Sequence, residues 1–301
     1  MTTPTLLPLT AADLPPLLPE LVVIGGAFAL LILDLFISNR HKVWTHFLSV
    51  AILAVAFAML LGGVGGQGEV FHGMFIRDNA ADVMKTVVVL VSGLTLIYGW
   101  SYLRERNLYQ GEIAVLVLFA TAGMMLLVSA GSLLMVYLGL ELLALCSYAL
   151  VASNRDNKLA AEAGMKYIVL GSLASGLLLY GMSLVYGATG SLHLDVIHAA
   201  AAHSDERVLL LTGAVFMVAG VAFKLGAAPF HMWLPDVYQG APAPIALFIS
   251  SAPKLAAFGM AYRLLEAGVG PLSAELQYVL AGLAALSLVV GNLMAIAQVN
   301  L

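Results

Sequence analysis

The stretch FKLGAAPFHMWLPDVYQGAP, residues 223–242, is apolar enough for a membrane helix but contains residues that a continuous helix does not tolerate. Proline has no backbone N–H to donate and its ring crowds the preceding turn, and Pro229, Pro235 and Pro242 all fall within this run. The pattern is compatible with one helix broken near residues 226–229 and followed by a second, or with three short helices. We favour the broken helix, because unwound backbone at membrane depth is typical of transporter binding sites.

The composition of the whole chain is that of a membrane protein. Hydrophobic residues make up 61% of the 301 residues and charged residues 10%, and the mean hydropathy is +0.99, whereas soluble domains are roughly 45–50% apolar and 25% charged. The net charge is only -4 and the 13 Lys and Arg residues are scattered, which excludes the basic stripe of a nucleic-acid-binding surface. We therefore expect an all-α integral membrane protein that is surrounded by the lipid bilayer.

Apolar runs of about 20 residues, the length that crosses a bilayer, predict nine transmembrane helices. The segment 112–152 is too long for one span, so we expect a tight turn at residues 130–132. The predicted spans cover residues 17–38, 43–63, 83–101, 112–130, 132–152, 162–187, 207–239 with its break, 244–265 and 275–298.

The loop charges predict the orientation, since Lys and Arg are enriched in cytoplasmic loops. The predicted cytoplasmic loops hold Arg40, Lys42, Arg104, Arg106, Arg155 and Lys158, whereas the outer loops and their flanks hold only Arg77, Arg207 and Arg263. This difference places the N-terminus outside. The N-terminal residues lack the basic region of a cleaved secretory signal, so we expect a multi-pass protein of the bacterial inner membrane that retains its first helix.

Two motifs with the spacing of ligand sites do not predict such sites here. Residues 63–68 match a dinucleotide-binding fingerprint, but that fingerprint must follow a strand, and this run follows a membrane helix, so we expect a flexible outer loop. His193, His198 and His203 recur every five residues, and at about 100° per residue they cannot share one helix face, which favours a solvated outer loop over a metal site. Cys146 is the single cysteine, too few for an iron–sulfur cluster with about four ligands. We expect no metal or cofactor in this chain.

Charged residues inside the predicted spans are the candidates for function, because a Lys or Asp at the centre of a membrane helix costs roughly 2.5–3.5 kcal/mol. Glu141 lies near the middle of its span and Lys224 lies beside the predicted break. The structural alternatives are a protonated glutamic acid bonded to a neighbouring helix and a lysine that extends to the interface. We favour a buried, titratable Glu141–Lys224 pair, in which movement of the carboxylate changes the proton affinity of the lysine.

Lys254 is the deepest basic group, near the middle of the span 244–265. It follows Pro253, which frees a backbone carbonyl one turn earlier that a water could bond. We expect Lys254 to be the central proton carrier, to which Lys224 passes protons through water or His231. His231 is equally compatible with a packed, hydrogen-bonded side chain.

Four other charged residues lie closer to the ends of their spans. Lys166 is compatible with a second relay or with a lysine that extends to the interface. Asp34, Lys85 and Glu112 are expected at the interface.

Residues 223–242 resemble the broken-helix signature of the antiporter-like membrane subunits of respiratory complex I. The resemblance extends over the whole chain in order, with Glu141 at the family's fifth-helix glutamate, Lys224 at its seventh-helix lysine and Lys254 at its eighth-helix lysine. It implies a fourteen-helix architecture that contains two inverted five-helix repeats, each of which supplies half a proton path.

The same resemblance implies that the chain is divided into three parts. Residues 1–111 form an N-terminal three-helix membrane segment, residues 112–265 an antiporter-like proton-channel repeat that includes the broken helix 207–239, and residues 266–301 the start of a second, truncated repeat. Because the sequence ends directly after the ninth predicted span, we expect it to cover the N-terminal two thirds of such a subunit.

The function implied by the resemblance is that of a membrane-arm subunit of a proton-translocating NADH:quinone oxidoreductase. Protons would pass through the buried Glu and Lys residues, and the flavin, the iron–sulfur clusters and the NADH and quinone sites would lie in partner subunits of respiratory complex I. The alternative is a subunit of a cation/proton antiporter, which shares residues of the Glu141, Lys224 and Lys254 type, but the segment Tyr238 to Gly240 argues against it. A purely structural scaffold does not explain three buried charges.

Overall fold

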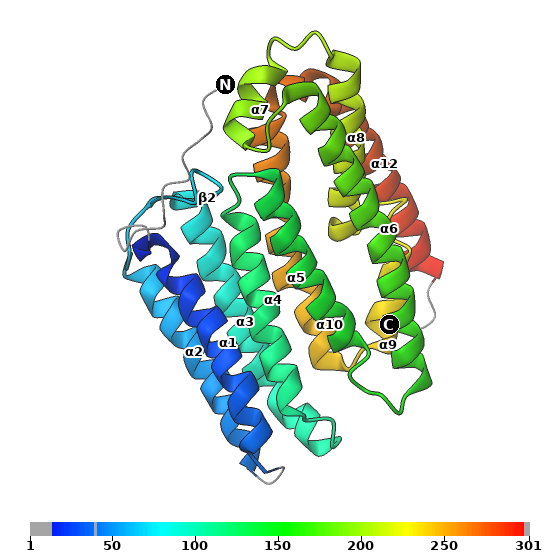
Figure 1. The fold of residues 1–301 in the computed structure, drawn as a ribbon. Coiled ribbons are helices and arrows are strands. Elements are labelled where there is room, and N and C mark those ends of the chain that lie inside the picture. The colour runs from blue at the N-terminus through cyan, green and yellow to red at the C-terminus, as the bar shows by residue number, and fades with distance from the viewer. Residues whose placement is uncertain (1–13, 39–40, 298–301) are drawn as a thin grey trace.

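The computed structural model describes residues 14–38 and 41–297, which are almost entirely helical (Figure 1). Within these ranges nine helical segments are long and apolar enough to cross a membrane, which confirms the nine predicted spans and the all-α membrane fold. The helices are α1 (Leu18–Phe36), α2 (Val43–Leu61), α3 (Asn79–Glu105), α4 (Gly111–Val128), α5 (Leu133–Val151), α6 (Lys158–Thr189), α7 (Leu194–Ala201), α8 (Arg207–Leu225), α9 (Trp233–Gly240), α10 (Ala243–Ser250), α11 (Ala252–Ala261) and α12 (Ser273–Ala297).

Several short elements complete the fold. A two-stranded antiparallel hairpin, β1 (Gly68–Val70) and β2 (Phe75–Arg77), joins α2 to α3. The end of the molecule that carries this hairpin is called the hairpin end below. A 3₁₀ turn (Pro15–Leu17) precedes α1, a π-helical segment (Tyr262–Gly268) continues α11, and a second 3₁₀ turn (Gly270–Leu272) leads into α12.

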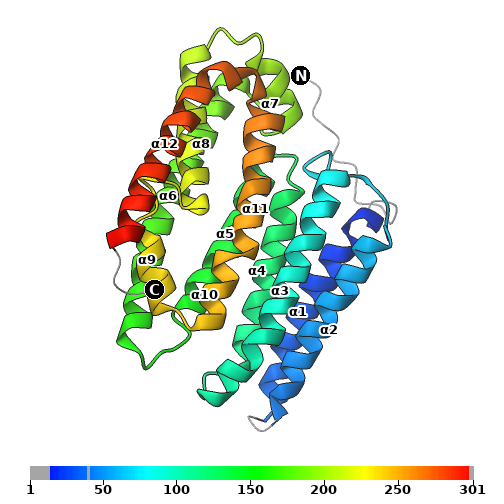
Figure 2. The ribbon, with the colours of Figure 1, turned by 180° about the vertical axis from the view of Figure 1, so that it is seen from behind.

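The helices form a bundle in which α10 and α11 occupy a central position. Helices α1 to α3 lie on one side, α4 and α5 in the middle, and α6, α8 and α12 on the other side (Figures 1 and 2). Helix α10 packs against α3, and α11 contacts α3, α4 and α8. The helix that carries Lys254 is therefore placed between the three-helix segment and the broken helix.

The predicted turn between α4 and α5 is present and is held from two directions. The N–H of Gly131 donates to the carbonyl of Met74 in the hairpin (2.8 Å), and the carbonyl of Gly131 accepts from the N–H of Leu194 in α7 (3.0 Å). A Cβ atom on Gly131 would lie only 2.0 Å from the carbonyl oxygen of Gly73, so glycine is required by this close approach.

Three segments differ from the sequence-based expectation. The glycine-rich run leads into the β-hairpin instead of a plain loop, and Gly65 packs against the backbone of Pro15. The histidine-rich segment contains α7, because Leu194, Ile197 and Ala201 form a buried apolar face at helical spacing. The span 244–265 has an interruption of its own between α10 and α11, at Ser251.

Glycines allow α4 and α5 to pack at close range. A Cβ atom on Gly139 would lie 2.9 Å from both the carbonyl oxygen of Gly123 and the N–H nitrogen of Leu127. Close backbone approach through small residues is a common way to pack helices in membranes, where burial from water does not drive association between helices. Glu141 lies on α5, two residues beyond this contact, so the same packing sets its position.

We predict that Gly139→Val lowers the stability of the folded protein by about 1–3 kcal/mol, because the added methyl groups force the two backbones apart. Gly176→Val is the matched control, since a Cβ atom on Gly176 has no neighbour within 4 Å. Thermal unfolding of the purified protein in detergent measures the effect. Equal midpoints for the two variants would show that α4 and α5 do not require this close contact.

Candidate functional site

The candidate site begins where α8 ends inside the bundle. Gly226 follows Leu225 with a φ of 79°, a left-handed conformation that glycine adopts without strain, and the chain becomes helical again only at Trp233. Pro229 lies in this interruption and has no N–H to donate to the carbonyl of Leu225. The break predicted at residues 226–229 is confirmed.

Lys254 binds the carbonyl end of α8. Its Nζ atom donates to the carbonyl oxygens of Lys224 and Leu225, at 3.0 Å each, and lies 4.6 Å from the centre of the Trp233 ring. The C-terminus of a helix carries a partial negative charge, and the face of an indole ring also attracts cations. The half-buried ammonium group thus compensates for backbone acceptors that the break leaves without intrahelical donors.

Lys224 is buried in an aromatic environment in the last turn of α8, beside the break. Its side chain is 7% exposed, and its Nζ atom lies 6.0 Å and 5.9 Å from the ring centres of Tyr148 and Tyr167. Among the described residues no carboxylate lies within ion-pairing distance of this ammonium group. Burial of a cation without a paired anion is costly, which sets Lys224 apart from a structural salt-bridge lysine.

Glu141 acts on Lys224 over a distance and not through a contact. It lies on α5 two turns before Tyr148, within electrostatic range of Lys224, and its Oε1 atom is buried without a hydrogen-bond partner. Among the described residues Glu141 and Lys224, which we expected to act as a titratable pair, are not within ion-pairing distance of each other. A buried carboxylate oxygen without a partner can still bind a proton or accept a hydrogen bond from a water molecule.

Stacked aromatic rings, which sequence reasoning did not single out, lie beside the two lysines. Trp233 is 2% exposed, stacks on Tyr167 with a centroid distance of 4.7 Å and an interplanar angle of 10°, and donates from Nε1 to the carbonyl of Phe223 (2.9 Å). This bond ties the start of α9 to the last turn of α8. A tryptophan among prolines in an apolar run was the signal that could have identified it.

Lys166 and His231 lie apart from this group. Lys166 bonds Glu162 (2.8 Å) on its own helix and Asp236 (3.1 Å) on α9, and 42% of its side chain is exposed. The His231 Nε2 atom contacts the Met294 sulfur on α12 at 3.1 Å, and its Nδ1 atom is buried without a partner. In the described part of the chain no hydrogen bond joins His231 to Lys224 or Lys254, so the expected relay through His231 is not formed directly.

A second set of buried charges lies at the hairpin end, and the sequence did not predict it. Lys85 on α3 and Glu20 on α1 form an ion pair of 2.5 Å, and the two side chains are 0% and 1% exposed. Lys85, which we expected at the membrane interface, is enclosed by protein and paired with a carboxylate. The physical reason is that a distant segment of the chain supplies a carboxylate, which span-end position does not reveal.

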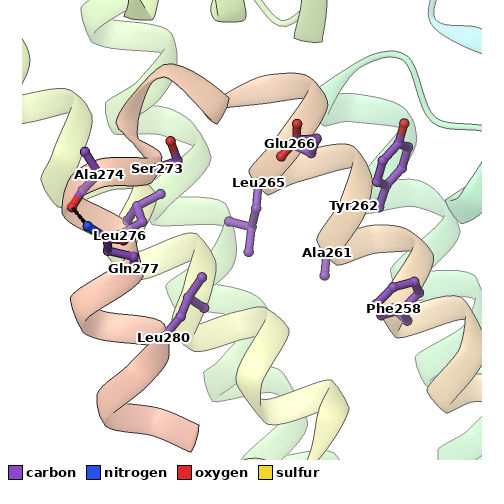
Figure 3. A pocket seen from close by; sticks show the side chains of 10 residues that line it. All are labelled: Phe258, Ala261, Tyr262, Leu265, Glu266, Ser273, Ala274, Leu276, Gln277 and Leu280. Atoms are coloured by element: carbon purple, nitrogen blue, oxygen red, sulfur yellow. Dashed lines mark hydrogen bonds between the residues drawn. The ribbon is translucent and has the colours of Figure 1, made fainter.

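A groove on the surface is separate from the lysine site. It lies between α11 with its π-helical extension and α12, and Figure 3 shows Phe258, Tyr262, Glu266 and Gln277 among the residues that line it. None of the lysines described above lines this groove. Among the described residues no cluster of His, Cys, Asp or Glu side chains could hold a metal ion.

An apolar helix bundle with an interrupted helix and buried, unpaired cations at the break is the architecture of ion-translocating membrane proteins. The chain belongs to the NADH:quinone oxidoreductase/Mrp antiporter transmembrane family, whose model matches residues 130–301.

Two curated relatives narrow this family assignment. The chain is 80% identical over 301 residues to NADH-quinone oxidoreductase subunit N from Xanthomonas euvesicatoria pv. vesicatoria, and 52% identical over 284 residues to the subunit of the same name from Halorhodospira halophila. These alignments cover 100% and 94% of the chain but only 62% and 59% of the relatives. The chain thus spans about three fifths of the length of these relatives.

Solved structures show the same fold. A chain of respiratory complex I from Thermus thermophilus with bound aureothin matches with a TM-score of 0.77 and 34% identity, over 93% of this chain and 58% of that chain. A chain of the membrane-bound sulfane sulfur reductase, an archaeal respiratory membrane complex, matches with a TM-score of 0.71 and 25% identity, over 88% and 56% of the two chains. A chain of the Mrp complex from Dietzia sp. DQ12-45-1b shares the fold, with a TM-score of 0.70 at 21% identity over 85% and 49% of the two chains.

We predict that Lys85→Met destabilises the protein by about 3–5 kcal/mol, because the substitution leaves Glu20 as a buried charge without a partner. The double variant Glu20→Leu/Lys85→Met should recover most of this loss, since neither charge remains. Arg155→Gln, which removes an ion pair whose side chains are 70% and 56% exposed, should cost no more than about 1 kcal/mol. Unfolding midpoints in detergent test all three variants, and a double variant less stable than Lys85→Met would contradict the pairing.

Proposed function

We propose that this chain is part of a membrane-arm subunit of a proton-translocating NADH:quinone oxidoreductase and that it conducts protons through Glu141, Lys224 and Lys254. The observation that carries the proposal is the geometry at the end of α8, where two lysines meet one interrupted helix and, among the described residues, Glu141 is the one carboxylate within electrostatic range of Lys224. Two cations and one anion leave an excess positive charge in an apolar bundle. Release of one proton relieves this excess.

Lys254 has the hydrogen-bonding geometry of a reversible proton carrier. An ammonium group has three donors, and two of them bond the carbonyls of Lys224 and Leu225. The third remains for transfer to a water molecule. The neutral amine that results keeps two N–H groups for the same carbonyls and gains a lone pair for the next proton, so both protonation states fit one position.

Lys224 and Glu141 supply the electrostatic control in this mechanism. At an effective dielectric constant of 20, two unit charges interact by about 4 kcal/mol at 4 Å and by about 1.7 kcal/mol at 10 Å. A proton on Lys224 therefore favours loss of the proton on Lys254. Movement of Glu141 towards Lys224 stabilises the proton on Lys224. Arginine at position 254 would not cycle, since a guanidinium group does not release its proton.

The remaining assignments follow from the same proposal. Electron transfer from NADH to quinone, with its flavin and iron–sulfur clusters, takes place in partner subunits, and the chain lies in the bacterial inner membrane among other membrane subunits of respiratory complex I. Residues 1–111 form a separate three-helix segment, residues 112–265 form the proton-conducting repeat, and residues 266–301 begin a second repeat. Lys166, paired with two carboxylates, is assigned as a second relay.

A subunit of a cation/proton antiporter is the second candidate, because the Mrp complex shares the fold. The curated relatives with 80% and 52% identity are oxidoreductase subunits, which favours the first candidate. Sodium-dependent proton exchange in vesicles, without NADH oxidation, would support the antiporter instead.

We predict that Glu141→Gln, Lys254→Ala and Lys254→Arg each lower the number of protons moved per NADH oxidised, because each removes a titratable group from the path. The ratio is measured in inverted membrane vesicles that contain the assembled enzyme with the variant at its chromosomal position. Lys158→Ala is the control, since Lys158 is exposed at the start of α6 and should leave the ratio unchanged. A wild-type ratio in all three site variants would remove the basis of the proposal.

A further inference from the structure

Helix α11, which carries Lys254, is a short rod with a discontinuity at each end. It is separated from α10 at Ser251, whose backbone angles (φ -115°, ψ -85°) are not helical and whose hydroxyl donates to the carbonyl of Leu247 (2.6 Å). At the hairpin end it passes into the π-helical segment Tyr262–Gly268. π-Helical turns are rare and occur frequently at functional sites. The backbone of α11 therefore continues into the π-helical segment, whereas its helix is interrupted before Ala252, so contacts of the π-helical segment bear directly on the placement of α11.

Arg263, the second residue of the π-helical segment, binds two other elements at once. Its guanidinium group donates from Nε to the carbonyl of Val128 at the end of α4 (2.9 Å) and from Nη2 to Oδ1 of Asp78 (2.9 Å), and its Nη1 atom forms an ion pair with Oδ2 of Asp78 at 2.8 Å. Arg263 is 5% exposed. A planar guanidinium held at three points restricts both translation and rotation of the helix that carries it.

Asp78 is a fixed partner in this contact. It lies just before α3 and caps that helix by accepting a hydrogen bond from the N–H of Ala81 (2.7 Å). Burial alone raises the pKa of its carboxyl, but the bonds from Arg263 and Ala81 outweigh burial, so the pKa lies below its ordinary value. Asp78 is therefore ionised at neutral pH. Arg263 does not release its proton, so both partners of the contact stay charged.

The packing next to this contact leaves little room for adjustment. A Cβ atom on Gly259, one turn before Arg263, would lie 2.6 Å from a methyl carbon of Val128 and 3.0 Å from the Met84 sulfur. Lys254 lies nine residues before Arg263, which corresponds to about 13.5 Å along the axis at 1.5 Å per residue. The rod is thus attached near one end by Lys254, a titratable group, and beyond the other by Arg263, a permanently charged group.

We propose that Asp78 and Arg263 are positioning residues, which hold α11 at the height and rotation at which Lys254 reaches the carbonyls of Lys224 and Leu225. The inference rests on the proton-carrier function proposed above for Lys254. If the contact at the hairpin end is lost, the π-helical segment can relax to α-helix. A shift of the helical register by one residue then rotates α11 by about 100°. Lys254 then no longer faces the end of α8, although the bundle remains folded.

The test measures protons moved per NADH oxidised in inverted vesicles that contain the assembled enzyme, together with the amount of assembled enzyme on native gels. Asp78→Asn should lower the ratio to the value of Lys254→Ala, whereas Asp78→Glu, which keeps the charge, should retain most of the wild-type ratio. Arg155→Gln is the matched control, because it removes the exposed Arg155–Glu112 pair far from α11, and it should leave the ratio unchanged.

A double variant separates positioning from a general structural effect. If Asp78 acts only through Lys254, the combined Asp78→Asn/Lys254→Ala variant should have the same ratio as Lys254→Ala alone. A lower ratio in the double variant, or a wild-type ratio in Asp78→Asn, would overturn the inference. If Asp78→Asn fails to assemble, Arg263→Lys decides, since it keeps the charge but cannot make all three contacts, and a wild-type ratio there would also overturn the inference.

The same measurements distinguish failure of the inference from failure of the proposed function. A wild-type ratio in Lys254→Ala refutes the proton-carrier function, and the inference falls with it. A reduced ratio in Lys254→Ala together with a wild-type ratio in Asp78→Asn and Arg263→Lys refutes only the positioning role.

Discussion

The structure depends on the requirement that backbone carbonyls at membrane depth find donors inside the protein. When α8 stops at Leu225, its last carbonyls lose the N–H groups that a continuing helix would supply. Pro229 has no N–H for Leu225, and the N–H of Ala228 is taken by the hydroxyl of Ser287 on α12 (2.9 Å). Lys254 supplies the missing donors from another helix. A cation from α11 thus stabilises the edge of the break.

Two kinds of buried charge occur in this bundle, and their surroundings differ. Glu20 and Lys85 form a closed ion pair with both side chains excluded from the surface, an arrangement whose charges compensate each other. Lys224 and Lys254 contact aromatic rings and carbonyls in place of carboxylates. Aromatic faces and carbonyl oxygens attract a cation without taking its proton, whereas a carboxylate can. Lys85 therefore suits a structural task, whereas Lys224 and Lys254 suit the binding and release of a proton.

Much of the fold was predictable from local features of the sequence. Apolar run length gave the nine spans, and Pro229 with Gly226 gave the interruption, because both act within a few residues of their own position. The break at Ser251 was not predicted, since serine alone does not stop a helix, and α7 was missed because eight residues give a short periodic pattern. The burial of Lys85 and the contact between Arg263 and Asp78 depend on chain segments that are distant in sequence. One sequence without an alignment contains no direct signal for such pairs.

The double role proposed for Lys254 also bears on how such a chain can change over generations. Under the proposed function, a substitution at this position alters a site for protons and, in the same step, leaves the carbonyls of Lys224 and Leu225 without donors. A replacement that is acceptable for folding must offer two donors on a long, flexible side chain, and one that is acceptable for chemistry must release a proton near neutrality. Among the common side chains lysine alone meets both conditions. If Lys254 carries protons as proposed, selection for a folded helix end and selection for proton transfer act on the same codon and favour the same residue.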